Sequence, residues 1–269
     1  MGIEDPRLDS EVMLAEATGW DRAELVANPQ ADLAPAAARL FGEMVRRRLR
    51  REPVAYIVGK KGFRRLDLAV DRRVLIPRPE TELLVEVALE RRPASLLDVG
   101  TGSGAIALAV ADELPGCEVT ATDTSSAALE VARANAERLG LADRVRFLAG
   151  TVPEGGAFDL VLANLPYVAE VDWSSLQPEV TEWEPREALL AGADGLDAIC
   201  SLLAGRVRPL FDIAQQTATS AAVLTPAVAL EVGEGRAGAV TELLREAGFQ
   251  ETETRCDFAG IERVVVGRP

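Results

Sequence analysis

The stretch SLLDVGTGSGAIALAVADE, residues 95–113, joins a short apolar run to a glycine-rich turn and then to an apolar run of helix length. Ser95–Val99 has the length and composition of a buried strand, and Ala105–Glu113 follows it as a helix. The alternation of strand and helix continues along the chain. This order predicts βαβ units and therefore an α/β fold with a parallel sheet.

The glycine-rich turn, residues 100–104, predicts a ligand site at the end of its strand. Glycines let the backbone approach a ligand closely and leave the amide groups at the start of the helix free to donate. Asp123 stands nineteen residues after Gly104, at the end of the next expected strand, residues 117–122. A carboxylate at that place can accept hydrogen bonds from ribose hydroxyls, so the pattern predicts a nucleoside cofactor. The expected cofactor-binding residues are Gly100, Thr101, Gly102, Ser103, Gly104 and Asp123.

Two other interpretations of this turn stay open. Gly100, Gly102 and Ala105 also satisfy the G-x-G-x-x-A pattern of nicotinamide sites. Asp123 could instead cap the helix that is expected over residues 125–139.

A second polar feature follows the apolar strand in FDLVLANLPYV, residues 158–168. Its corner offers a side-chain amide oxygen, a carbonyl before a proline and an aromatic ring. Chemistry in open α/β sheets sits just past such strand ends. Acceptors beside a flat wall suit a planar NH2 group, so the candidate catalytic residues are Asn164, Leu165, Pro166 and Tyr167. A simple strand-ending turn is the structural alternative, because Asn and Pro are common turn residues.

Length and composition indicate a globular chain in a reducing compartment. Its 269 residues and 48% hydrophobic content are enough for one large core and a small accessory domain. Cys117, Cys200 and Cys256 are far apart and form no CxxC pair, which disfavours a disulfide framework or a zinc site. The acidic N-terminus lacks the pattern of a signal peptide, and no apolar run has the length of a membrane span. We expect a cytoplasmic protein with no metal site and no membrane contact.

The net charge of −14 is unevenly distributed along the chain. Residues 1–92 hold 17 Lys and Arg against 16 Asp and Glu, so residues 93–269 hold 12 against 27, a net charge of −15. Because a phosphate backbone binds through Lys and Arg, this acidity disfavours direct nucleic-acid binding. Histidine is absent, which excludes imidazole bases, Ser-His and Cys-His nucleophile systems and His metal sites.

The first fifty residues predict a small helical bundle. A first helix is expected to be capped by Asp9 or Ser10 and to end at Gly19, and a third helix is expected over residues 35–51. The arginines at the end of the third helix suit the negative end of its dipole, and they form either a solvated helix end or a docking patch for an acidic partner. Alternation at residues 66–70 predicts a strand of a hairpin opened around Lys60-Lys61-Gly62.

Several motifs together resemble a known family. Residues 95–104 resemble the first motif of class I S-adenosylmethionine methyltransferases, and the strand-end Asn-x-Pro-Tyr resembles the fourth motif of those that methylate amino or amide nitrogen. Four further matches are similar to the protein-(glutamine-N5) methyltransferases of peptide chain release factors: REPVAYIVG (51–59), IPRPETE (76–82), LEVG (230–233) and DFAGIERVVVGR (257–268). The matches occur in the family's order and span nearly the whole chain.

The resemblance implies a Rossmann-like seven-stranded methyltransferase sheet with a small N-terminal helical bundle and a β-hairpin linker. The implied domains are a helical substrate-recognition domain at residues 1–52, the linker at 53–78 and an S-adenosylmethionine-binding catalytic domain at 79–269.

The resemblance also implies a reaction and a cofactor. The side-chain amide nitrogen (N5) of the glutamine in the Gly-Gly-Gln loop of class I peptide chain release factors would be methylated by S-adenosyl-L-methionine, with S-adenosyl-L-homocysteine as product. Asn164 and the Leu165 carbonyl would accept hydrogen bonds from that amide, and Tyr167 would pack beside it. Residues 100–104, Asp123 and Asn164 would hold the cofactor.

Three features depart from the family pattern. Leu165 stands where the family has a proline, which gives the Asn-Leu-Pro-Tyr form associated with ribosomal RNA adenine dimethyltransferases. Thr151 stands where the family has an acid, and the atypical segment 205–229 lacks the usual Pro-Gly-Gly turn. The alternatives that stay open are a ribosomal-protein glutamine methyltransferase, an rRNA or DNA adenine-N6 methyltransferase and a degraded, non-catalytic cofactor-binding module. A nicotinamide oxidoreductase is disfavoured because no residue takes the proton-donor role.

Overall fold

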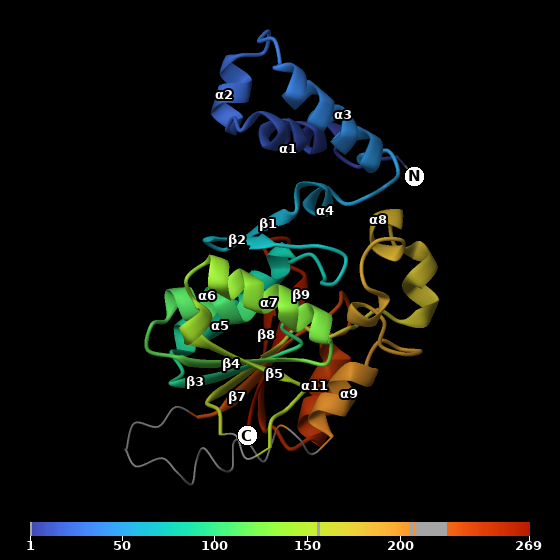
Figure 1. The fold of residues 1–269 in the computed structure, drawn as a ribbon. Coiled ribbons are helices and arrows are strands. Elements are labelled where there is room, and N and C mark those ends of the chain that lie inside the picture. Colours follow the sequence, from blue (N-terminus) through green and yellow to red (C-terminus); the bar gives the residue numbers. More distant parts are fainter. Residues whose placement is uncertain (1, 155–156, 205–206, 208–224) are drawn as a thin grey trace.

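A computed structural model describes residues 2–154, 157–204, 207 and 225–269, and shows an α/β sheet domain with a small helical bundle at one end (Figure 1). Of the atypical segment 205–229, residues 205–206 and 208–224 lie outside these described ranges.

The bundle consists of α1 (Pro6–Thr18), α2 (Arg22–Ala27) and α3 (Pro35–Arg48). The expected cap of the first helix at Asp9 or Ser10 is wrong. The helix begins earlier, at Pro6, where the fixed φ of proline suits a first turn, and the Asp5 side chain accepts a hydrogen bond from the backbone. Gly19 ends α1 in the left-handed conformation with φ 72°, as the sequence predicts.

Ion pairs tie the end of α3 to the sheet domain. The Arg48 side chain lies between two carboxylates, with Nε 2.6 Å from Asp9 and Nη1 2.7 Å from Glu179. Arg51 also pairs with Glu179. Since Glu179 belongs to α8 (Pro178–Thr181), the acidic group that meets these two arginines comes from the chain itself.

The helix α4 (Val54–Val58) and the antiparallel hairpin of β1 (Lys60–Phe63) and β2 (Leu66–Ala69) connect the bundle to the sheet. Met13, Met44 and Ile57 form the buried contact between the bundle and α4. The hairpin turns at Arg64, which has a φ of 52°. The extended segment that follows ends in η1 (Pro79–Thr81) and α5 (Glu82–Arg91).

Among the described residues, seven strands form the central sheet: β3 (Ser95–Val99), β4 (Glu118–Asp123), β5 (Val145–Ala149), β6 (Leu160–Ala163), β7 (Ala227–Glu231), β8 (Glu251–Cys256) and β9 (Glu262–Arg268). Their order is β5-β4-β3-β6-β7-β9-β8, and the strands pair in parallel except where β9 meets β7 and β8. The predicted Rossmann-like sheet of seven strands is confirmed. The strand order reverses between β3 and β6, and ligands of open α/β sheets bind at such a switch point.

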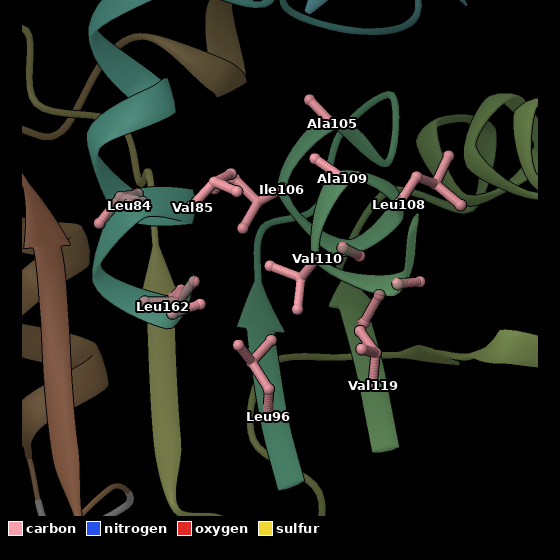
Figure 2. Packing of buried hydrophobic residues seen from close by; sticks show 14 of the residues in the cluster. Leu84, Val85, Leu96, Ala105, Ile106, Leu108, Ala109, Val110, Val119 and Leu162 are labelled. Atoms are coloured by element: carbon pink, nitrogen blue, oxygen red, sulfur yellow. The ribbon is translucent and has the colours of Figure 1, made fainter. Parts of the chain in front are cut away.

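Helices cover both faces of the sheet: α5, α6 (Ala105–Glu113) and α7 (Ser126–Arg138) on one, and α9 (Asp197–Leu203) and α11 (Ala237–Glu246) on the other. Neighbouring strand residues alternate between the two cores. Leu96 packs into the first, in which Val85 of α5 and Ile106 of α6 lie next to one another (Figure 2), and Leu97 packs into the second. This period of two explains why the strands are apolar without interruption.

Short elements complete the described chain: η2 (Ala142–Arg144) precedes β5, and η3 (Glu170–Ser175), α8 and η4 (Arg186–Ala188) lie between β6 and α9. Within the described part of the chain, no helix combines the length and the apolar character that crossing a membrane requires.

Candidate functional site

A cavity of about 460 Å³ opens at the carboxyl ends of β3, β4 and β6, beside the point where the strand order reverses. Its volume lies in the range of small-molecule sites. The residues that were selected from the sequence and that line it are Gly100, Gly102, Asp123, Asn164, Leu165 and Pro166. The cavity thus brings together the glycine turn and the polar corner, which lie far apart in the sequence.

Gly100 and Gly102 line the cavity in left-handed conformations, with φ of 77° and 56°. A Cβ added at Gly100 would lie 3.1 Å from Cδ2 of Leu165, so the glycine turn and the polar corner are in close contact. The backbone amides of Gly100 and Thr101 each donate to the Thr122 carbonyl at 2.9 Å, which ties the turn to β4.

The other three residues of the turn do not line the cavity. Thr101 Oγ1 donates to Asp98 Oδ2 at 2.7 Å, and the Ser103 carbonyl accepts from Asn135 Nδ2 at 2.9 Å. Gly104 caps α6 with a φ of 85°, and a Cβ there would lie 2.9 Å from a leucine side chain of the same helix. These residues hold the shape of the turn.

Asp98 is fully buried beneath the turn. Burial raises the pKa of its carboxyl to about 7, against the lowering effect of hydrogen bonds from the Thr101 hydroxyl and the Ala107 amide. Among the described residues, its Oδ1 has no hydrogen-bond partner. Asp98 is therefore a structural acid whose charge changes near neutral pH.

Asp123, the last residue of β4, bridges the turn and the next helix. Its Oδ2 accepts from the Gly102 amide at 2.9 Å, and its Oδ1 accepts from the Ser125 amide at 2.8 Å. The alternative that Asp123 caps the helix is wrong, because Ser125 is the N-cap of α7 and accepts from Ala128 N at 3.2 Å. Each carboxylate oxygen can accept more than one hydrogen bond, so Asp123 keeps acceptor capacity toward the cavity.

Asn164 follows β6 directly, and its side-chain amide is held from one side. Its Nδ2 donates to Thr81 Oγ1 at 3.0 Å. Within the described ranges, no group donates a hydrogen bond to Asn164 Oδ1 or to the Leu165 carbonyl. The two acceptors that the sequence suggested therefore have no donor among the described residues, and they belong to residues that line the cavity.

Tyr167 is not among the residues that line the cavity, and its ring packs against Gly233. A Cβ at Gly233 would lie 3.1 Å from Cδ2 of Tyr167, and a Cβ at Gly195 would overlap the Tyr167 backbone oxygen. Burial and the nearby Glu231 carboxylate raise the pKa of the Tyr167 hydroxyl to about 12, so the phenol stays neutral. Tyr167 supports the corner through close backbone and ring contacts.

Sequence reasoning assigned no role to two buried polar residues next to the corner. Thr81, at the end of η1, is 3% exposed, and Glu231, at the end of β7, is 2% exposed. Burial raises the pKa of Glu231 to about 7, and a side-chain hydrogen bond from Thr81 opposes this rise. Both residues stand in motifs quoted for the family resemblance. An acid at the end of an otherwise apolar strand was the signal that could have identified Glu231.

The segment that carries Thr81 to Asn164 is itself anchored. The buried Glu184 carboxylate accepts from the Ile76 amide at 3.1 Å and pairs with Arg78. These contacts fix the proline-rich segment before η1, and so they fix where Thr81 lies.

Other walls of the cavity come from segments that sequence reasoning did not select. Arg73 and Leu75 come from the stretch after β2, Glu187 from η4 and Leu202 from α9. Thr151, which stands where the resembling family has an acid, also lines the cavity. These residues are distant in sequence and carry no shared motif.

Two family models match the chain. Residues 1–59 match the PrmC N-terminal domain, and residues 79–179 match the methyltransferase small domain. The release factor glutamine methyltransferase of Caulobacter vibrioides is 40% identical over 275 residues, which cover 99% of this chain and 90% of that protein. The release factor glutamine methyltransferase of Xylella fastidiosa is 42% identical over 271 residues, which cover 97% and 93%.

Solved structures resemble the fold at low sequence identity. A methyltransferase from Pyrococcus furiosus has a TM-score of 0.54 and 18% identity, covering 84% of this chain and 98% of that one. The hMettl16 catalytic domain, in complex with an RNA hairpin, has a TM-score of 0.53 and 17% identity, covering 75% and 74%. At these identities the likeness shows a shared methyltransferase fold alone.

Proposed function

This chain belongs to the release factor glutamine methyltransferase family, and on that premise we propose that it methylates the side-chain amide nitrogen of the glutamine in the Gly-Gly-Gln loop of class I peptide chain release factors. The observation that carries the proposal is the single cavity in which Gly100, Asp123 and Asn164 meet. A cofactor held by the glycine turn would there lie beside Asn164 Oδ1 and the Leu165 carbonyl, to which no described residue donates a hydrogen bond.

The residues around the cavity fit S-adenosyl-L-methionine. Gly100 and Gly102 have no side chain and adopt positive φ, which permits close approach of a ligand to the backbone. Asp123 has acceptor capacity left for ribose hydroxyls. When bound, the cofactor supplies an electrophilic methyl group on a positively charged sulfur and leaves as S-adenosyl-L-homocysteine.

The task of the corner is to position a weak nucleophile. An amide nitrogen has a delocalised lone pair, so it must be held in line with the methyl group and its hydrogens must be accepted. Asn164 Oδ1 and the Leu165 carbonyl are two such acceptors, and their hydrogen bonds strengthen as positive charge develops on the nitrogen. The methylated nitrogen is acidic and can lose its proton to water, so no strong base is required.

The substrate we favour is a protein. Residues 93–269 carry a net charge of −15, which opposes binding to a phosphate backbone. The bundle within residues 1–52 is the proposed substrate-recognition domain, held to the sheet domain by the pairs of Arg48 and Arg51 with Glu179. A release factor as substrate also implies that the reaction takes place in the cytoplasm.

The deciding experiment is transfer of a labelled methyl group from S-adenosyl-L-methionine to a purified class I release factor. Matched controls are the release factor with its loop glutamine changed to alanine, a ribosomal-protein preparation and bare ribosomal RNA. We expect label on the intact loop alone. Label on RNA would move the protein to the adenine class, and cofactor binding without label on any acceptor would indicate a non-catalytic module.

A further inference from the structure

The side-chain amide of Asn164 carries an oxygen on one side and an NH2 group on the other. Only the oxygen can accept a hydrogen bond from the NH2 group of an acceptor amide. A half-turn about the last side-chain bond exchanges the two groups, which have nearly the same size and shape. The reaction therefore needs a device that fixes the direction of this amide.

Two buried residues next to the corner supply such a device. Asn164 Nδ2 lies 3.0 Å from Thr81 Oγ1. Glu231 lies on the other side of Thr81, whose side-chain hydrogen bond lowers the pKa of its carboxyl, and among the described residues its buried Oε2 has no hydrogen-bond partner. Thr81 and Glu231 are 3% and 2% exposed, so water does not compete for these bonds. Neither residue is among those that line the cavity.

We propose that Thr81 and Glu231 are positioning residues that hold the Asn164 amide with its oxygen directed toward the side-chain amide of the substrate glutamine. This inference rests on the proposed function and deepens it, because it names what orients the group on which the substrate docks.

The charge on Glu231 decides which group donates and which accepts in the hydrogen bonds that join Glu231, Thr81 and Asn164. A carboxylate only accepts hydrogen bonds, so the single hydroxyl hydrogen of Thr81 is committed to Glu231. The Thr81 oxygen can then only accept from its other neighbour, which is the NH2 group of Asn164. The amide oxygen of Asn164 is left for the cavity.

A neutral group in place of the carboxylate removes this constraint. In Glu231→Gln the new NH2 group can donate to Thr81, whose hydroxyl is then free to donate to Asn164. The Asn164 amide could then rotate by a half-turn and direct its NH2 group toward the NH2 group of the substrate glutamine, which cannot accept a hydrogen bond from it. The substitution keeps the size of the side chain, so the change in hydrogen-bond direction is its main effect.

Protonation of Glu231 should act in the same way. The groups that face it are Glu80 and Thr81 of η1, Arg78 just before η1, Arg263 of β9 and the Tyr167 hydroxyl. Burial outweighs the two arginines and raises the pKa of Glu231 to about 7. We expect methyl transfer to rise with pH through about 7, and we expect this step to be absent in Glu231→Gln.

The first test observes the Asn164 amide without any substrate. In uniformly 15N-labelled protein, the side-chain NH2 signals of Asn164 are identified by their loss in Asn164→Asp. They should shift with pH with a midpoint near 7 in the wild-type protein, and this shift should be missing in Glu231→Gln and in Thr81→Val. The proposal would be overturned if the chemical shifts of these signals changed neither with pH nor in the two variants.

The second test measures transfer to the release factor. Thr81→Val keeps the shape of the side chain but removes the hydroxyl, and it should lower kcat by about tenfold to a hundredfold with little change in the KM for S-adenosyl-L-methionine. Thr81→Ser, which restores the hydroxyl, should recover most of the loss. Thr254→Val, the same change at an exposed position of β8, should transfer as the wild type does.

The two tests separate the inference from the function on which it rests. Equal transfer by Thr81→Val and the wild type would overturn the positioning role and leave the methyltransferase function standing. If the wild-type protein labels no release factor, the proposed function fails, and the titration of the Asn164 signals still decides whether Thr81 and Glu231 orient the amide.

Discussion

The two sides of the cavity are built in different ways. The glycine turn draws on two neighbouring parallel strands, and its contacts, such as Asp123 with the Gly102 amide, lie within about one βαβ unit. The acceptor corner draws on three distant segments, which contribute Thr81, Asn164 and Glu231. A motif of the first kind is visible in a sequence, whereas one of the second kind exists only once the strands are ordered.

Substitutions on the two sides should affect different quantities: methyl transfer at the corner and cofactor affinity at the glycine turn. Asn164→Ala removes one transition-state acceptor of the corner and leaves the glycine turn intact. We expect methyl transfer to fall by a factor of about a hundred or more, with cofactor affinity little changed. Steady-state kinetics with the release factor, beside calorimetric titration of the cofactor, measure both quantities. Unchanged turnover would remove Asn164 from the site.

Asp123→Ala tests the other side. It deletes the proposed acceptor for the ribose and also the acceptor for the Gly102 and Ser125 amides. Hydrogen bonds to a charged group contribute about 1.5–3 kcal/mol, so cofactor affinity should fall by about tenfold to a hundredfold. Calorimetric titration of the cofactor decides this, and equal affinity in the variant would refute the ribose role.

Gly195→Ala probes how tightly the corner is packed. Both Gly195 and Gly235 have positive φ, but a Cβ at Gly195 would overlap the backbone oxygen of Tyr167, whereas one at Gly235 meets nothing within 4 Å. Gly235→Ala should therefore cost only the backbone strain, about 1–2 kcal/mol of unfolding free energy. Gly195→Ala should cost more than this and should lower transfer. Equal losses in urea unfolding would mean that the corner yields without strain.

The dependence of stability on pH sharpens the comparison, because each side holds a buried acid whose pKa is raised by burial. Asp98 and Glu231 have folded pKa values of about 7, above the value of about 4 in an unfolded chain. A raised folded pKa contributes stability that is present below the unfolded pKa and is lost as pH rises through the folded value. The free energy of unfolding should fall by about 3–4 kcal/mol per group between about pH 4 and 8.

Urea unfolding over this pH range is the measurement. Asp98→Asn should remove the part of the fall that belongs to the glycine turn, and Glu231→Gln should remove the part that belongs to the corner. A free energy of unfolding that rises with pH over this window would contradict the assignment. If the assignment holds, the corner is most stable at a low pH, where Glu231 is protonated, and most active at a higher pH, where Glu231 is ionised.

Local physics explains what could be predicted from the sequence. Apolar runs of strand length, each followed by a helix, led to the α/β sheet, and glycines before a helix led to the turn of Gly100 and Gly102. The same reasoning failed at the start of α1, where Asp9 or Ser10 was expected as the cap. The cap is Asp5, and the helix begins at Pro6. It also did not separate Gly100 and Gly102, which line the cavity, from Thr101 and Ser103, whose groups bond inward.

The sequence by itself determined the strands, the glycine turn and the chemical types at the site, because each depends on residues that are neighbours in the chain. Only the tertiary structure decided which polar groups meet. Strand order places Glu231 of β7 beside β6, and the anchored segment before η1 brings Thr81 to Asn164. The direction of a hydrogen bond between such distant groups depends on their burial and charge, and a linear pattern does not carry that information.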